Sequence, residues 1–168
     1  MKNVKFNVGR QDVQVLSLPY KDASYSLYII LPNRGLPLEV FAKSLSATEF
    51  ADLIRNVYGG KIHVSLPRFK IELMTDGVKL LKAVGVESIF KPQGEFGKIT
   101  KDERMAVSVI KHKAVIEVNE EGTVAAAATG FGVTAKCRRP PTPEFIADRP
   151  FLYAIVKDAH ILFIGQYV

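Results

Sequence analysis

Residues 144–168 read EFIADRPFLYAIVKDAHILFIGQYV, and this carboxyl-terminal stretch sets the framework for the rest of the chain. Two segments within it, Phe151–Val156 and Ile161–Val168, are rich in β-branched and aromatic residues and predict two strands. The sequence Asp158-Ala159-His160 predicts the turn between them. Because Ile161–Val168 is largely apolar, it is typical of a strand buried in the centre of a sheet.

A β-hairpin is predicted in the amino-terminal part of the chain. Apolar and polar residues alternate in Val13–Tyr20 and again in Ser24–Pro32, and a short polar turn separates the two segments. Asn33-Arg34-Gly35 then closes the hairpin with residues that favour turns.

The other predicted elements are short and lie between these strands. Ser46 and Glu49 form the pattern of a capping box, which predicts the start of a helix. The remaining predictions are a strand that bends at Pro67 (Lys61–Glu72), a long run with β character (Met105–Val118), and helices at Leu38–Ala42, after Ser46 as far as Ile54, and at Val78–Val84.

The segment Glu120–Pro143 fits neither the helical nor the strand period. A segment of this length without an element of its own is uncommon inside a compact domain and indicates a functional loop or a disordered one. Its alanine run, Thr123–Thr129, is compatible with a helix, since alanine is the best helix former. It is also compatible with a segment that becomes a strand, because the residues that would share one face are all small: Thr123, Ala125, Ala127 and Thr129.

Composition and charge are those of an ordinary globular protein. The chain has 168 residues, of which 48% are hydrophobic and 24% charged, as expected for one domain. Its net charge of +6 permits binding to polyanions but selects none of them. Cys137 is the only cysteine, so an internal disulfide is excluded. The first residues lack the apolar run of a signal peptide, and no segment is long and apolar enough for a membrane span.

No pattern in the sequence indicates an enzyme, a cofactor or a metal site. The chain has neither a G-x-S-x-G motif nor a glycine-rich phosphate loop. The histidines His63, His112 and His160 lie far apart, and a structural role is expected for each. The cations beside Cys137 favour a reactive thiolate, although an exposed thiol without a catalytic task is the expectation.

Two motifs in the second half of the chain resemble those of the serpins. Glu120-Glu121-Gly122-Thr123-Val124-Ala125-Ala126-Ala127-Ala128 is similar to the serpin hinge. Phe145–Ile155, centred on Asp148-Arg149-Pro150-Phe151, resembles the serpin signature near the carboxyl terminus. Shorter matches agree with these in order and spacing: Leu18-Pro19-Tyr20, Ile30-Leu31-Pro32 and His112-Lys113-Ala114.

The resemblance implies an α+β serpin fold in partial form. Residues 1–168 would be the carboxyl-terminal part of a serpin domain, with strands of sheets A, B and C, a few short helices and the amino-terminal half absent. An exposed reactive loop would cover about residues 120–143. In the family, the position of His112 packs in a hydrogen-bond network, the shutter, with residues of the half that is absent here.

The resemblance also implies a mechanism and its residues. A serpin offers its reactive loop as bait, and after cleavage the loop inserts into a sheet while the acylated protease is carried along. The scissile bond usually follows the residue fourteen places after the hinge glycine, which here gives Lys136-Cys137. The residues of the hinge and inserting loop would be Glu120, Gly122, Thr123, Ala125, Ala127 and Thr129, and those of the signature Asp148, Pro150 and Phe151.

The function expected from these observations is inhibition of a trypsin-like serine protease, because Lys136 suits a pocket with a buried carboxylate. The resemblance to the serpins implies that the protein acts outside the cell. A non-inhibitory or truncated serpin fragment that binds a polyanion, such as a glycosaminoglycan, is the alternative. Nucleic acid and membranes are not expected as partners.

Overall fold

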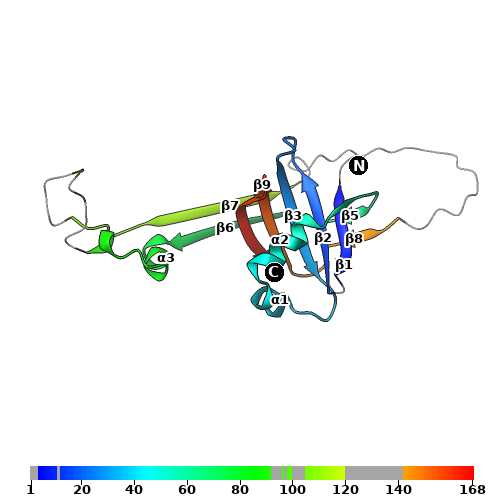
Figure 1. The fold of residues 1–168 in the computed structure, drawn as a ribbon, viewed down its shortest axis with the longest axis horizontal. Helices are drawn as coiled ribbons and strands as arrows, with labels where there is room; N and C mark the ends of the chain where they lie inside the picture. The colour runs from blue at the N-terminus through cyan, green and yellow to red at the C-terminus, as the bar shows by residue number, and fades with distance from the viewer. Residues whose placement is uncertain (1–3, 11, 92–95, 97, 100–104, 120–141) are drawn as a thin grey trace, which may run out of the picture. The chain divides into compact units, whose positions relative to one another are not determined.

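The computed structural model describes residues 4–10, 12–91, 96, 98–99, 105–119 and 142–168 (Figure 1). The chain divides into two compact units. The first unit contains Met1–Arg68 and Val118–Val168, and the second contains Phe69–Glu117.

A six-stranded sheet forms the centre of the first unit (Figure 1), with the order β10-β9-β3-β2-β1-β4. The predicted hairpin is confirmed, since β2 and β3 pair antiparallel from Val13 opposite Pro32 to Pro19 opposite Ser26. Strand β9 lies between β3 and β10 and pairs antiparallel with both. The bounds are β1 Lys5–Arg10, β2 Val13–Pro19, β3 Tyr25–Pro32, β4 Tyr58–Gly59, β9 Phe151–Lys157 and β10 His160–Tyr167.

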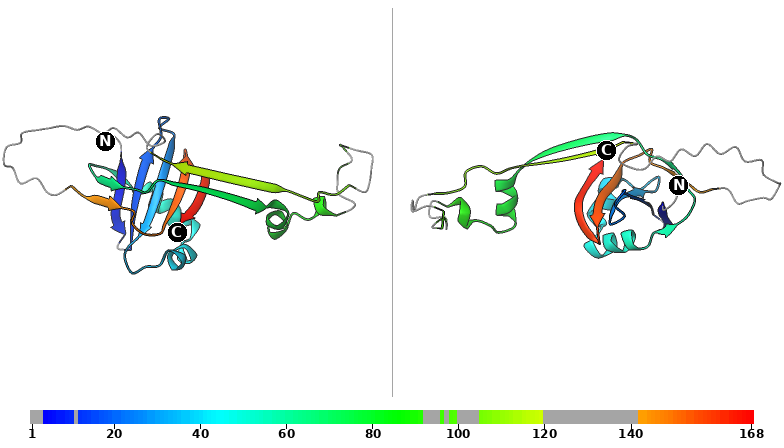
Figure 2. Two further views of the ribbon diagram at one scale, coloured as in Figure 1. Left: turned by 180° about the vertical axis from the view of Figure 1, so that it is seen from behind. Right: turned by 90° about the horizontal axis from the view of Figure 1, so that it is seen from above.

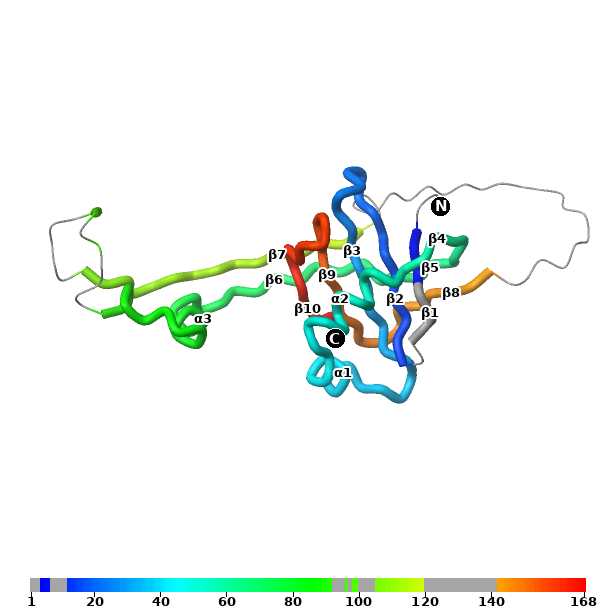
Figure 3. Tube along the Cα trace, in the orientation of Figure 1, coloured from blue at the N-terminus to red at the C-terminus, as the bar shows by residue number. Residues whose placement is uncertain are grey.

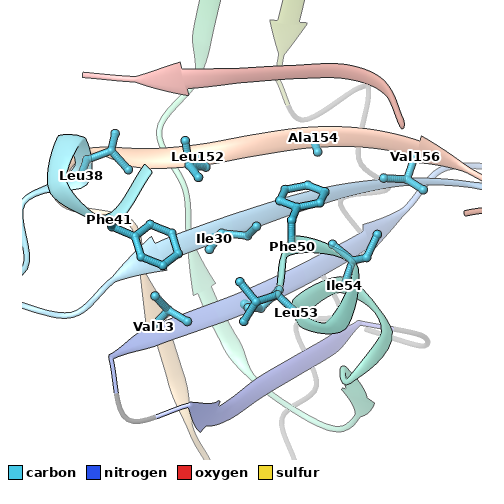
Figure 4. Packing of buried hydrophobic residues seen from close by; sticks show 11 residues of the cluster. Val13, Ile30, Leu38, Phe41, Phe50, Leu53, Ile54, Leu152, Ala154 and Val156 are labelled. Atoms are coloured by element: carbon cyan, nitrogen blue, oxygen red, sulfur yellow. The ribbon is translucent and has the colours of Figure 1, made fainter. Parts of the chain in front are cut away.

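Two helices, α1 (Leu38–Ser44) and α2 (Ala47–Arg55), pack on the sheet and bury a hydrophobic cluster (Figure 4). The predicted capping box begins α2, because the Glu49 N–H donates to Ser46 Oγ at 3.2 Å and the Ser46 N–H donates to Glu49 Oε2 at 2.9 Å. The cluster consists of Val13, Val15, Ile30, Leu38, Phe41, Phe50, Leu53, Ile54, Leu152, Ala154 and Val156. Helices near the amino end and a strand near the carboxyl end therefore share one core.

The prediction of a single strand over Lys61–Glu72 is wrong, because two strands in different sheets occupy this segment. Strand β5 (His63–Ser65) pairs in parallel with β8 (Glu144–Ile146), and the two lie side by side in Figure 3, whereas β6 (Phe69–Asp76) pairs with β7 (Lys111–Val118). The break contains Pro67, which has no N–H to donate to a strand ladder.

In the second unit, β6 and β7 run in opposite directions in a two-stranded sheet (Figure 2). The helix α3 (Gly77–Ala83) follows β6, and Asp76 caps it by accepting the Val78 N–H at 3.0 Å. A short 3₁₀ turn, Ser88–Phe90, lies beyond α3.

The β character predicted for Met105–Val118 is realised only from Lys111 onward. Residues 105–110 form no strand, because some of their backbone groups form hydrogen bonds outside a strand ladder. The Ile110 carbonyl accepts the Gly77 N–H at 2.8 Å, and the Val107 N–H donates to the Ile89 carbonyl at 2.8 Å. These bonds take the place of a regular ladder in this part of the segment.

The prediction that Ile161–Val168 is a buried central strand is also wrong. Strand β10 is the outer strand of the sheet, and Ile161, Leu162, Phe163 and Ile164 have exposed fractions of 47%, 48%, 41% and 58%. An apolar run indicates that both faces of a strand are apolar, but it does not indicate whether the strand pairs with one neighbouring strand or with two. Among the described residues, β9 is the only strand that pairs with β10.

The exposed edge of β10 predicts self-association of the 168-residue chain, since an apolar edge strand offers unpaired backbone groups to another copy. We expect light scattering after size exclusion to show oligomers. The substitution Ile164→Lys should raise the concentration at which they form by about tenfold, or ~1.4 kcal/mol.

The matched control is Val40→Lys, which puts the same charge on an apolar residue of α1 that is 56% exposed. This control should leave the association unchanged. A wild-type chain that remains a monodisperse monomer with a cooperative melt at every concentration would contradict the prediction.

Candidate functional site

The predicted hinge and scissile bond lie outside the described residues. This applies to Glu120, Gly122, Thr123, Ala125, Ala127, Thr129, Lys136 and Cys137. The structure does describe the segments on both sides of them. We call β7 with Asn119 the amino stem, and residues 142–150, which include β8, the carboxyl stem.

Backbone hydrogen bonds fix the carboxyl stem against β5. The Pro143 carbonyl accepts the His63 N–H at 2.9 Å, and the Ala147 N–H donates to the Ser65 carbonyl at 2.8 Å. Between these bonds, the side chains of β8 alternate, with Phe145 buried and Glu144 and Ile146 exposed. The stem is therefore attached at both ends of β8 and by the buried Phe145.

Two arginines hold the carboxylate of Asp148, which follows β8. Arg149 Nη1 donates to Asp148 Oδ1 at 2.8 Å, and Arg34 Nη2 forms an ion pair with Asp148 Oδ2. Arg149 also donates from Nε to the Pro32 carbonyl at 2.7 Å. The signature residue Asp148 is thus linked to the end of β3 and to the turn that follows it.

The electrostatic surroundings favour the ionised form of Asp148. Partial desolvation acts to raise the pKa of this carboxyl group, while the hydrogen bond from Arg149 and the positive charge of Arg34 act to lower it. The two cations prevail, so that the pKa of Asp148 is below its ordinary value.

A tight turn presents Arg34 to Asp148. The Leu36 N–H donates to the Asn33 carbonyl at 3.1 Å, and Gly35 has a φ of 95°. Positive φ at this turn position suits glycine, which has no Cβ to strain the backbone. The turn predicted at Asn33-Arg34-Gly35 is confirmed.

The remaining signature residues join the stem to the sheet. Pro150 is exposed, whereas Phe151 is fully buried and stacks on Tyr167 with ring centroids 4.8 Å apart. The two rings are cross-strand neighbours, because Phe151 pairs with Tyr167 in the register of β9 and β10.

Beside the amino stem, Glu72 of the neighbouring strand β6 lies between two lysines. Lys113 Nζ is 2.7 Å from Glu72 Oε2, and Lys70 Nζ is 3.3 Å from Oε1. The hydrogen bond from Lys113 lowers the pKa of Glu72 most, followed by that from Lys70. His112, the predicted shutter residue, is exposed on β7 next to Lys113.

Arg34, Arg149 and Tyr167 were not among the predicted site residues. Arg34 lies 114 positions from Asp148 in the sequence, so no local pattern links them. The sequence indicates Arg149 only as part of the signature motif. Its hydrogen bond to the Pro32 carbonyl depends on the pairing of β3 with β9. Tyr167 could be identified only once the register of β9 and β10 was known.

The first unit also contains an apolar cavity of about 490 Å³ between its helices and β9 and β10. The lining includes Leu45, Phe50, Leu152 and Ile161. None of the predicted site residues lines this cavity.

Within the described ranges, no three or more His, Cys, Asp or Glu side chains lie together as a group that could hold a metal ion. No helix in those ranges is both long and apolar enough to cross a membrane.

The family described as Serpin (serine protease inhibitor) matches residues 1–168. The chain belongs to the serpin family. Iripin-5 of Ixodes ricinus is 38% identical to this serpin over 92% of the chain and 40% of the relative, and Serpin B8 of Homo sapiens is 36% identical over 99% and 46%. A crystal structure of native protease nexin-1 with heparin is similar with a TM-score of 0.75 and 31% identity, over 99% of this chain and 45% of that one.

These comparisons establish an α+β serpin fold in partial form. The serpin chain spans less than half the length of these three relatives.

The ion pairs of Glu72 predict a pH dependence of the amino stem. Because the pKa of Glu72 is below its ordinary value of 4.5 in the folded chain, its contribution to stability is present above about pH 4.5 and is lost as the pH falls through the lowered value. In Glu72→Gln, amides of β6 and β7 should be less protected from hydrogen exchange than in wild type at pH 7, and this difference should shrink as the pH is lowered below 4.5.

Glu87→Gln serves as the control, because it removes an exposed carboxylate of the same unit whose ion pair is with Lys91 and not with β7. A difference between wild type and Glu72→Gln that stays constant from pH 7 to pH 3 would show that the charge of Glu72 is not responsible.

Proposed function

We propose that this chain carries the reactive loop of a serpin-type serine protease inhibitor that acts on trypsin-like proteases. The supporting observation is the place of the bait sequence in the fold. Residues 120–141, which include the hinge and Lys136, connect β7 to the carboxyl stem, and the backbone bonds of Pro143 and Ala147 hold that stem.

The proposed mechanism is suicide inhibition with loop insertion, as the serpin resemblance implies. A protease attacks the bond after Lys136, and the segment from Glu120 to Thr129 then enters a sheet as a new strand. Small side chains at Thr123, Ala125 and Ala127 suit this step, because bulky or charged groups would be costly to bury.

The basic residue at the proposed scissile bond sets the class of target. A lysine fits a specificity pocket that holds a buried carboxylate, as in trypsin. Arg138 is a nearby competitor, whereas Pro140 after Arg139 makes that bond poor bait. The protein would be an inhibitor and not an enzyme, and it would need no cofactor.

A second candidate function is binding of a polyanion without inhibition. The net charge of +6 and the cations Lys136, Arg138 and Arg139 favour it, and protease nexin-1 has been crystallised with heparin. If Arg138→Ala together with Arg139→Ala abolishes retention on heparin while the trypsin cut after Lys136 is unchanged, binding replaces inhibition as the favoured function.

We propose an extracellular location from the family resemblance. A relative from Tachypleus tridentatus, 34% identical, is called Intracellular coagulation inhibitor 2. Measuring the protein in medium and cell fractions with an antibody would test the location.

The proposed scissile bond predicts the first product of trypsin. Trypsin should cut first after Lys136, which gives a carboxyl-terminal fragment that begins at Cys137 and is identified by its intact mass. Lys136→Ala should remove this fragment, whereas Lys61→Ala in the first unit should not. A first cut after Arg138 would show that Arg138, and not Lys136, is the bait residue.

Trapping of the protease is best tested with residues 120–142 grafted into a full-length relative such as human Serpin B8. The graft should form a complex with trypsin that withstands denaturant, and Lys136→Ala should abolish it. Thr123→Arg should keep the cut and lose the complex, since a charge in the inserting strand is costly to bury. A Thr123→Arg graft that still traps trypsin would exclude loop insertion for this sequence.

A further inference from the structure

The ion pair between Arg34 and Asp148 joins the turn after β3 to the carboxyl stem, just beyond the end of the pairing of β3 with β9. Arg34 lies in the turn between β3 and α1, and Asp148 lies between β8 and β9. Among the described residues, strand β8 pairs with β5 alone in a two-stranded sheet, whereas β3 belongs to the six-stranded sheet. The pair therefore ties the carboxyl stem to an element outside its own small sheet.

The two oxygens of Asp148 have different partners, which gives the two arginines different roles. Arg149 binds Oδ1 and is anchored by its bond to the Pro32 carbonyl, so it orients the carboxylate. Arg34 binds Oδ2 from across the turn. Loss of Arg34 would leave the Asp148 carboxylate with the hydrogen bond from Arg149, its neighbour in the sequence.

We propose that Arg34 is a positioning residue, which acts through Asp148 to fix where the carboxyl stem leaves the sheet and so determines which loop bond a protease reaches. The proposal rests on the proposed function, since it concerns the loop that the stem carries. Bonds close to a fixed end of a loop are harder for a protease to draw into an extended conformation than bonds further away. Arg138 is nearer to the anchored Pro143 than Lys136 is, so a firm stem favours the cut after Lys136.

The expected effect is modest. The side chain of Arg34 is 77% exposed and that of Asp148 is 37% exposed, and exposed ion pairs contribute little unless several charges form a network. Here the carboxylate has two charged donors, which favours a measurable effect. We expect local changes of about two- to fivefold.

Hydrogen exchange of the whole chain tests, without a protease, whether the ion pair of Arg34 and Asp148 holds the carboxyl stem. The amides of His63 and Ala147 form the two backbone bonds that hold the stem. In Arg34→Gln both amides should exchange about two- to fivefold faster, while amides of β2 and β3 keep their rates. Asp148→Asn should have at least the same effect, and the double variant should add little to it, because the two residues act as one unit.

Trypsin cleavage of the same variants tests positioning, which a merely structural role would not change. In Arg34→Gln the ratio of first cuts after Arg138 to those after Lys136 should rise about two- to fivefold. Arg34→Lys keeps the charge but loses the planar fork, so it should restore part of the wild-type ratio.

Arg55→Gln is the matched control, because it removes one exposed arginine of the first unit, at the end of α2, far in sequence from the stem. It should change neither the exchange of the two amides nor the cut ratio. Rates for His63 and Ala147 equal to those in this control would overturn the proposal. So would faster exchange throughout β2 and β3, or faster exchange of the stem with an unchanged distribution of cuts.

A result that contradicts the proposed function can be distinguished from one that contradicts the proposal for Arg34. If the first cut in wild type falls at a residue other than Lys136, the bait assignment is wrong. The proposal for Arg34 is then decided by whether Arg34→Gln changes both the exchange of the stem and the distribution of cuts.

Discussion

The burial of β9 between β3 and β10 is the constraint on which the first unit depends. Phe151 and Ala154 are fully buried in this strand, and Leu152 and Val156 reach into the cluster beneath α1 and α2. Burial of such side chains is the main favourable contribution to folding. A strand near the carboxyl end therefore completes a core whose other residues come from the amino-terminal hairpin and the two helices, and neither part can bury its apolar face without the other.

This arrangement determines how the carboxyl stem is held. The stem enters β9 directly after Asp148-Arg149-Pro150, so its end cannot move without disturbing the buried Phe151. The amino stem depends on different contacts, since β7 pairs with β6 in the second unit and Lys113 bridges to Glu72 across that pair. A loop held in this way has one end set by a large apolar core and the other by a two-stranded sheet with exposed charges. The second kind of attachment is the weaker one, because exposed ion pairs contribute little to stability.

The sequence predicts those parts of the fold whose cause is local. The alternation of apolar and polar residues predicts β2 and β3. The side chains of Ser46 and Glu49 accept hydrogen bonds from backbone N–H groups of their own turn, so four residues are enough to predict the start of α2. Non-local features are not readable in this way. The edge position of β10 depends on which strands are its neighbours, and the short strands β1, β4 and β8 exist only through their partners. Residues 105–110 have β-forming side chains, yet bonds to Gly77 and Ile89 take part of their backbone out of a strand.

The same distinction separates the motifs of the candidate site. The signature can be recognised as a pattern, but what it does physically becomes clear only from its partners: Arg34 from a distant turn, the Pro32 carbonyl from the end of β3, and Tyr167 from β10. Pro32 and Tyr167 belong to the sheet that contains β9, and Arg34 lies in the turn directly after β3. Asp148 and Phe151 thus form a junction that fastens the stem to the core. The chemistry proposed for the protein lies in residues 120–141, whose small and basic side chains have meaning only if both stems hold the loop for a protease to reach.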